Sequence, residues 1–281
     1  MSPARRNCHV AAAVLHGGSG IAMIYFARVE SSTWQPHVYA AQAEWVDARE
    51  GGACSSAADD WLCEVRAHLG RALPVNVYAI LATFFFVSFA AEVAYALEER
   101  QSWRWLEYAF SSALQFFAIE VLSNVLNLEA AVFGALLVAS LQVYGYLIER
   151  QLDVDPEHAV PAQPLVEGKR VAPQPPAVRG GRTDCHLWLA LGFVQLLAAW
   201  VPVFYHFGRS NAPWWVWLIV LGSFATYGLF GVVMVLRVAC EWTAERADYC
   251  FTALSLLSKL LVSWVYFGGT HMRKGHVTSS T

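Results

Sequence analysis

The sequence predicts an all-α membrane protein with seven transmembrane helices, and two observations support this fold class. Charged residues make up 15% of the 281-residue chain, whereas soluble domains carry about 25%. In addition, seven apolar runs are each long enough to cross a bilayer core, which needs roughly 20 residues of helix. Because lipid accommodates only helices and closed barrels, and these runs are too long for strands, we expect helices. The same composition excludes a disordered chain and a basic nucleic-acid binder.

The seven expected spans form a single domain, residues 1–281. They cover residues 8–27, 73–97, 102–126, 130–148, 185–207, 212–236 and 247–268. The first is the weakest, because the string HGGSG at 16–20 interrupts it. The Arg5-Arg6 pair before it resembles the start of a signal peptide, but no small-residue cleavage site follows, so we interpret the run as a span.

Two long segments separate the spans. Residues 28–72 have a mixed composition, and residues 149–184 contain six prolines, which favour an extended linker. Cys54 and Cys63 lie in the first segment. They form either a disulfide or two free thiols, and no Cys or Cys/His spacing is typical of a metal site.

Basic residues indicate how the bundle is oriented. A cytoplasmic N-terminus leaves eleven Lys and Arg residues inside and seven outside. Cytoplasmic loops carry an excess of such residues. We therefore expect a cytoplasmic N-terminus and an extracellular C-terminus, with 28–72 outside and the Pro-rich 149–184 inside.

Lysine is the least frequent charged residue in the chain, and one of the lysines lies deep within a predicted span. Lys169 and Lys274 lie outside the spans, whereas Lys259 lies near the middle of the seventh. A buried ammonium is costly, so it loses its charge, pairs with an acid, or condenses with an aldehyde to form a Schiff base. Polar side chains spaced by three and four residues share its helical face. These are Thr252, Ser255, Ser263 and Tyr266.

The third span offers an acid for this lysine. Arg104 and Glu107 are three residues apart and so share a face, which Ser111 and Gln115 continue. Glu107 is either the anion for a cation on another helix or the partner of Arg104 in a local ion pair.

These two spans resemble one branch of the retinal-binding rhodopsins, the heliorhodopsins. Residues 104–112 read RWLEYAFSS, similar to the family string RW-x-EY-x-x-SS. Residues 245–247 read ERA and residues 254–259 read LSLLSK, similar to the family's ERA and LSL-x-x-K strings. The long segment after the first span and the cytoplasmic N-terminus also match. The resemblance implies a seven-helix rhodopsin bundle that binds all-trans-retinal, sits in membrane lipid as a homodimer and has no enzymatic activity.

The resemblance also implies roles for individual residues. Lys259 would carry retinal as a Schiff base, Glu107 would be its counterion, and Ser255 would bond near the linkage. Arg104 and Glu149 would form a polar network at the cytoplasmic ends of spans three and four, with His16 in a cytoplasmic cavity. Candidates for the aromatic pocket walls are Tyr108, Trp200, Phe224 and Tyr227.

Span three departs from the expected pattern at Gln115 and Glu120. Glu120, Asn124 and Asn127 are spaced by four and three, which predicts a second polar stripe on this helix. Glu120 is either an acid near the interface, solvated or paired, or part of a polar route outward. Glu92 near the inner end of span two could extend such a route inward.

Three functions remain open at this point. The first is a light sensor that signals through a cytoplasmic partner or the 149–184 loop. The second is a light-gated conductor or transporter of protons. The third is a light-regulated regulator of a partner enzyme, since the chain contains no nucleotide loop or metal motif.

Overall fold

The computed structural model describes residues 2–29, 36–47, 63–97, 103–153, 182–210 and 212–278. Within these ranges the chain forms seven helices and one β-hairpin. The helices are α1 (Pro3–Val29), α2 (Val77–Leu97), α3 (Trp103–Leu122), α4 (Leu128–Asp153), α5 (Arg182–Phe207), α6 (Trp214–Ala239) and α7 (Ala244–Thr278). The strands are β1 (His37–Asp47) and β2 (Cys63–Pro74).

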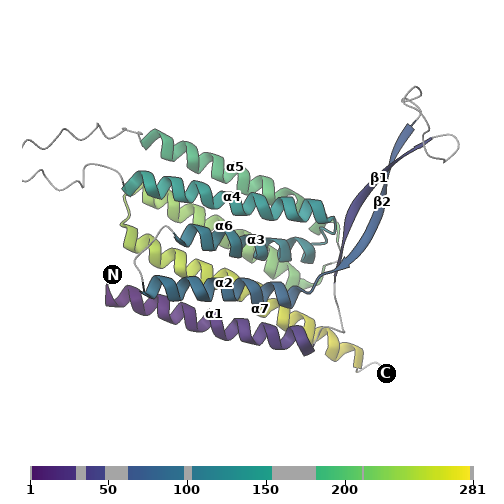
Figure 1. Ribbon diagram of the computed structural model, residues 1–281, viewed down its shortest axis with the longest axis horizontal. Helices are drawn as coiled ribbons and strands as arrows, with labels where there is room; N and C mark the ends of the chain where they lie inside the picture. Colours follow the sequence, from purple (N-terminus) through teal and green to yellow (C-terminus); the bar gives the residue numbers. More distant parts are fainter. Residues whose placement is uncertain are drawn as a thin grey trace, which may run out of the picture.

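The helices pack side by side into one bundle, and the hairpin projects from one of its ends (Figure 1). We call this the hairpin end, and we call the opposite end, where α1 begins, the N-terminal end. β1 and β2 pair antiparallel from His37 opposite Pro74 to Asp47 opposite Cys63. The sequence did not predict this hairpin in residues 28–72, because no clear apolar and polar alternation marks it.

Short polar residues set where several helices begin. The Asn76 side chain accepts a hydrogen bond from the Ala79 N–H at 3.1 Å, and Asn127 accepts one from the Ala130 N–H at 2.7 Å. Thr243 does the same for the Arg246 N–H at 3.3 Å. Each of these side chains satisfies a backbone donor that has no partner within its own helix.

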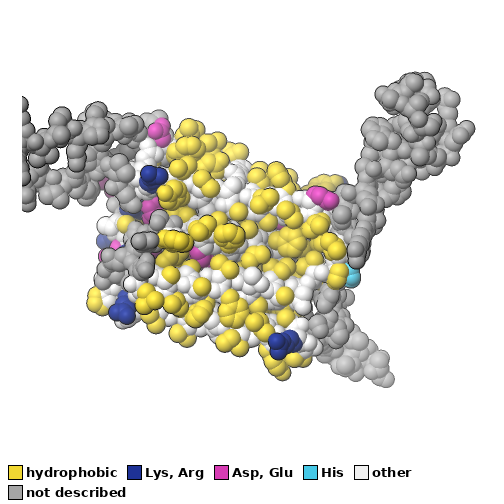
Figure 2. Space-filling model, in the orientation of Figure 1, with side chains coloured by type: hydrophobic (Ala, Val, Ile, Leu, Met, Phe, Trp, Pro, Cys, Tyr) yellow, Lys and Arg dark blue, Asp and Glu magenta, His cyan; other side chains and the backbone are white. Residues whose placement is uncertain are grey.

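The outer face of the bundle is apolar, as a lipid-facing surface must be. Six helices of the described chain are long and apolar enough to span a membrane. The helix outside this set is α3, whose 20 residues carry Arg104, Glu107 and Glu120. Figure 2 shows hydrophobic side chains over the flank of the bundle, with charged ones toward its two ends. The predicted all-α, seven-helix membrane fold is confirmed, and the protein is an integral, multi-pass membrane protein.

The interrupted first run is one continuous helix. Gly17 and Gly20 are positions of close approach to α2, because a Cβ added at either would lie 3.1 Å from Phe89 or 3.2 Å from Phe86. Small residues at a helix interface let two membrane helices pack closely. The glycines that weaken the sequence signal therefore form the α1–α2 contact.

The predicted polar stripe of Glu120, Asn124 and Asn127 is wrong, because α3 ends at Leu122. Asn124 has a left-handed backbone with φ of 67°, and Asn127 caps α4. The three side chains therefore belong to a helix, a turn and a cap. Most of 149–184 and the Cys54 partner of the proposed disulfide lie outside the described residues.

Two adjacent glycines in α7 allow a test of this packing. A Cβ at Gly269 would lie 2.3 Å from the Trp215 ring of α6, whereas a Cβ at Gly268 would meet nothing within 4 Å. We expect Gly269→Ala to destabilise the bundle by about 1–3 kcal/mol through overpacking. Gly268→Ala is the matched control and should leave the thermal midpoint in detergent unchanged or slightly raised. Equal midpoints for the two variants would contradict the α6–α7 packing.

Candidate functional site

The centre of the bundle holds a buried ion pair between α7 and α3. Lys259 is 2% exposed and Glu107 is 7% exposed. The Lys259 Nζ lies 3.0 Å from the Glu107 Oε1. Because each charge would be costly to bury alone, each stabilises the other in this position.

Two serines complete the surroundings of this pair. The Lys259 Nζ donates a hydrogen bond to the Ser255 Oγ at 2.6 Å, one turn earlier on α7. The Ser88 hydroxyl on α2 donates one to the Glu107 Oε1 at 2.6 Å. Ser255 was predicted from its spacing to Lys259. Ser88 was not predicted, since a single serine in an apolar span is usually a packing residue.

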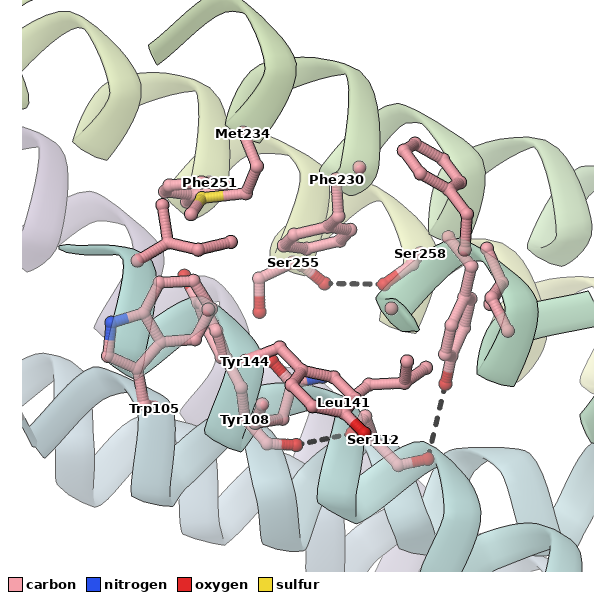
Figure 3. Close-up of a pocket in the computed structure, with 18 of the residues that line it drawn as sticks. Trp105, Tyr108, Ser112, Leu141, Tyr144, Phe230, Met234, Phe251, Ser255 and Ser258 are labelled. Atoms are coloured by element: carbon pink, nitrogen blue, oxygen red, sulfur yellow. Dashed lines mark hydrogen bonds between the residues drawn. The ribbon is translucent and has the colours of Figure 1, made fainter. Parts of the chain in front are cut away.

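A cavity opens beside Lys259 and runs between α3, α4, α5, α6 and α7. In Figure 3, Trp105 and Tyr108 lie on one side of it, and Phe230, Met234 and Phe251 lie on the other. Tyr144 of α4 and Trp188 of α5 stack with ring centroids 5.8 Å apart and also line the cavity. Eight of its lining residues are aromatic, and Lys259 is the one charged side chain among them.

Two of the four aromatic residues that the sequence suggested line the cavity. These are Tyr108 and Tyr227. Trp200 and Phe224 lie behind Tyr227 instead, with the Trp200 ring 6.0 Å from Tyr227 and 5.3 Å from Phe224. The expectation that they form the wall is therefore corrected to a supporting position. Most of the residues that line the cavity were not predicted from the sequence, because aromatic residues at helical spacing occur both in pocket walls and in packed cores.

The polar side chains that continue the Glu107 face also reach the cavity. Ser111 and Gln115 both line it. The Gln115 side-chain amide donates a hydrogen bond to the Ser258 backbone carbonyl of α7 at 3.2 Å. Gln115 thus links α3 to α7 at the residue that directly precedes Lys259.

A second group of buried charges lies toward the N-terminal end. We call it the Arg104 cluster, and its members are Arg5, His9, Glu92, Arg104, Glu149 and Asp248. The Arg104 guanidinium donates to the Asp248 Oδ1 at 2.5 Å and to the Glu149 carboxylate. The Trp105 indole N–H donates to the other Glu149 oxygen at 2.5 Å. The alternative, a local ion pair between Arg104 and Glu107, does not form, because Arg104 pairs with Asp248 and Glu149 instead.

Helices α1 and α2 complete the Arg104 cluster. The His9 Nδ1 lies 2.6 Å from the Glu92 Oε2, and its Nε2 lies 3.3 Å from the Asp248 Oδ2. Arg5 pairs with the same Asp248 oxygen at 2.5 Å. Asp248 could have been found from spacing, because Asp248, Thr252, Ser255 and Lys259 follow one another by steps of four, three and four on one helical face. His9 was missed because it lies at the very start of the first span.

Two predicted residues lie apart from both groups. His16 is buried on α1 and packs against the Phe85 ring of α2 at 5.8 Å, with neither ring nitrogen hydrogen-bonded to the described chain. Glu120 is fully buried near the hairpin end, and its carboxyl oxygens likewise have no hydrogen-bond partner among the described residues. Glu120 is therefore neither exposed on the surface nor paired with a described side chain.

The cavity suits the retinal that the sequence resemblance implies. A polyene aldehyde needs an amine that reaches an apolar pocket, and Lys259 lines this cavity together with eight aromatic residues. The Glu107 carboxylate beside the amine matches the need of a cationic linkage for an anion. Among the described residues, no three His, Cys, Asp or Glu side chains are grouped to hold a metal ion.

Comparison with known proteins agrees with this geometry. The heliorhodopsin family model matches residues 5–271, which is nearly the whole chain and includes all seven helices as far as the end of the α7 span. No curated protein sequence matches the chain. The match includes both Lys259 and Glu107, as well as the cavity walls. The chain therefore belongs to the heliorhodopsin family, whose members are light-sensing rhodopsins of the membrane that bind retinal.

Proposed function

We propose that this chain is a photoreceptor in which Lys259 carries all-trans-retinal and Glu107 is the counterion. The observation that carries the proposal is the 3.0 Å contact between the Lys259 Nζ and the Glu107 Oε1, with Lys259 lining the cavity. Lys259 is the only lysine within a predicted span, so no other amine competes for the aldehyde.

When bound, retinal supplies visible absorption and a light-driven change of shape. The residues around it supply the electrostatics. Glu107 fixes a positive charge at the Lys259 nitrogen, and Ser255 and Ser88 hold the nitrogen and the carboxylate in place. Because these contacts lie in a desolvated site, a small displacement of the nitrogen changes their strength more than it would in water.

Three helices connect this site to the Arg104 cluster. On α3, Glu107 is one turn from Arg104, and on α2, Ser88 is one turn from Glu92. On α7, Lys259 and Ser255 share a face with Thr252 and Asp248, and all four are buried. A change in the Glu107 contact therefore acts on the same helices that hold the cluster together. A light-biased two-state change of this kind can signal.

We further propose that the N-terminal end faces the cytoplasm and is where a signalling partner binds. The excess of basic residues expected on this side supports the orientation. The Arg104 cluster also lies at the N-terminal end, which supports placing the signalling surface there. Assembly as a homodimer is a proposal from the family resemblance.

Replacing the lysine tests the linkage. Lys259→Ala should abolish pigment formation when all-trans-retinal is added to the purified protein, because the attachment amine is gone. The visible absorption spectrum measures this. Lys274→Ala is the control and should keep the full pigment, because that residue lies beyond the α7 span. Visible pigment with normal yield in Lys259→Ala would refute the assignment.

Neutralising the counterion tests the electrostatics. Glu107→Gln should shift the visible absorption maximum to longer wavelength, because loss of the fixed anion lets the positive charge spread along the polyene. The spectrum should be compared with that of Glu149→Gln, which removes a carboxylate from the Arg104 cluster and should shift it much less. An unchanged maximum in Glu107→Gln would remove this residue as counterion.

A photocurrent measurement separates signalling from proton conduction. We expect no sustained current in illuminated, voltage-clamped cells at any membrane potential, because the Arg104 cluster joins α1, α2, α3, α4 and α7 with paired charges across the N-terminal end. Lys259→Ala cells control for direct effects of light. A sustained, pigment-dependent current would instead favour the light-gated conductor.

A further inference from the structure

Glu120 of α3 is a buried acid that the proposed function does not use. It is 0% exposed, and neither carboxyl oxygen has a hydrogen-bond partner among the described residues. Its side chain lies against the backbone of α4 at Gly134, where an added Cβ would be only 2.0 Å from the Glu120 Oε1. The absence of a side chain at Gly134 is therefore what makes room for the carboxyl.

Among the residues that the structure describes, no counter-charge lies beside this carboxyl. The buried charged residues on the helices packed against α3 are engaged elsewhere, since Glu92 and Glu149 belong to the Arg104 cluster and Lys259 pairs with Glu107. Glu129 at the start of α4 is exposed. An unpaired carboxylate in an apolar interior is so costly that the group binds a proton instead. Glu120 is therefore neutral in the folded protein.

Tyr227 of α6 connects this acid to the cavity. Its hydroxyl donates a hydrogen bond to the Ser112 carbonyl of α3 at 3.1 Å, and its ring lies 6.2 Å from Phe116. Ser112, Phe116 and Glu120 are spaced by four residues and so follow one face of α3. Tyr227 also lines the cavity. A displacement of Tyr227 thus acts on α3 at Ser112 and Phe116, two turns and one turn before Glu120.

We propose that Glu120 is a second, light-responsive proton-binding site, which holds a proton in the dark and releases it at the hairpin end under illumination. In this step the carboxylic O–H bond breaks and a water molecule at the hairpin end accepts the proton. The same proton is regained from water as the dark state recovers, so there is no net transport. This inference rests on the proposed function, because retinal must supply the displacement of Tyr227.

The position of Glu120 explains why release is toward the hairpin end. Helix α3 ends at Leu122, two residues later, and Asn124 in the following turn is exposed. The opposite direction leads along α3 past Gln115 to the Lys259–Glu107 pair and the closed Arg104 cluster. Exchange is therefore confined to one side of the bundle.

Light-minus-dark infrared spectroscopy of the retinal-bound full chain in lipid nanodiscs tests the site. Wild type should lose intensity in the carbonyl-stretch region of protonated carboxylic acids on illumination. Glu120→Gln, which keeps size and neutrality, should lack this band. Glu129→Gln, an exposed acid at the same end, is the matched control and should retain it. A band of full size in Glu120→Gln would overturn the proposal.

A pH-indicator dye tests proton release independently. A light flash should transiently acidify the medium around wild-type nanodiscs, and the signal should fall at least severalfold in Glu120→Gln but not in Glu129→Gln. Equal acidification in wild type and Glu120→Gln would overturn the proposal. Gly134→Ala provides a further test, because its Cβ would displace the carboxyl and should shift the dark carbonyl band.

The outcomes distinguish this inference from the proposed function. If all-trans-retinal gives no visible pigment with wild type, the proposed function fails. If the pigment forms and depends on Lys259 but light leaves the Glu120 carbonyl band unchanged, only the present inference fails. The dark carbonyl band of Glu120 should be present even without retinal, and its absence at neutral pH would also overturn the inference.

Discussion

The ion pair between Lys259 and Glu107 is the constraint on which the rest of the structure depends. An ammonium in the middle of a membrane helix is tolerated only with an anion at hydrogen-bond distance, and Glu107 meets this need at 3.0 Å. The carboxylate in turn requires the Ser88 hydroxyl. One charge on α7 therefore fixes the relative positions of α2, α3 and α7, and the cavity forms beside the contact that these helices share.

The Arg104 cluster applies the same principle to a larger set of charges. Asp248 accepts contacts from Arg5, His9 and Arg104, so one carboxylate links α1, α3 and α7. Removing one member of such a group leaves the others buried without compensation, which is why these groups act as a unit. The pair and the cluster share α2, α3 and α7. A displacement at Lys259 therefore reaches the cluster through these helices.

Spacing on individual helices singled out the residues of the central site, because membrane burial makes every charge within a span informative. Lys259 and Ser255 follow from that logic, whereas for Glu107 the spacing left two partners open, Lys259 and Arg104, and the structure pairs it with Lys259. Contacts between helices were harder to predict. Ser88 and His9 act through partners on α3 and α7, and the spacing within one span does not reveal which faces meet. Trp200 and Phe224 were misplaced for a related reason, since an aromatic residue in a wall and one behind it have the same sequence signal. The β-hairpin was missed because it lies outside the membrane, where apolar runs give no guide.

The two halves of the bundle place their buried acids in different surroundings. At the N-terminal end Glu92, Glu149 and Asp248 form direct pairs. Toward the hairpin end, Glu120, Ser123, Ser223 and Ser263 have no side-chain hydrogen bond to the described chain, although all are fully buried. Buried hydroxyls of this kind are usually satisfied by internal water. A paired network transmits displacement rigidly, whereas unpaired groups near water exchange protons. The contrast between the paired acids of the Arg104 cluster and the unpaired Glu120 is therefore the structural basis of both proposals, signalling at the N-terminal end and proton exchange at the hairpin end.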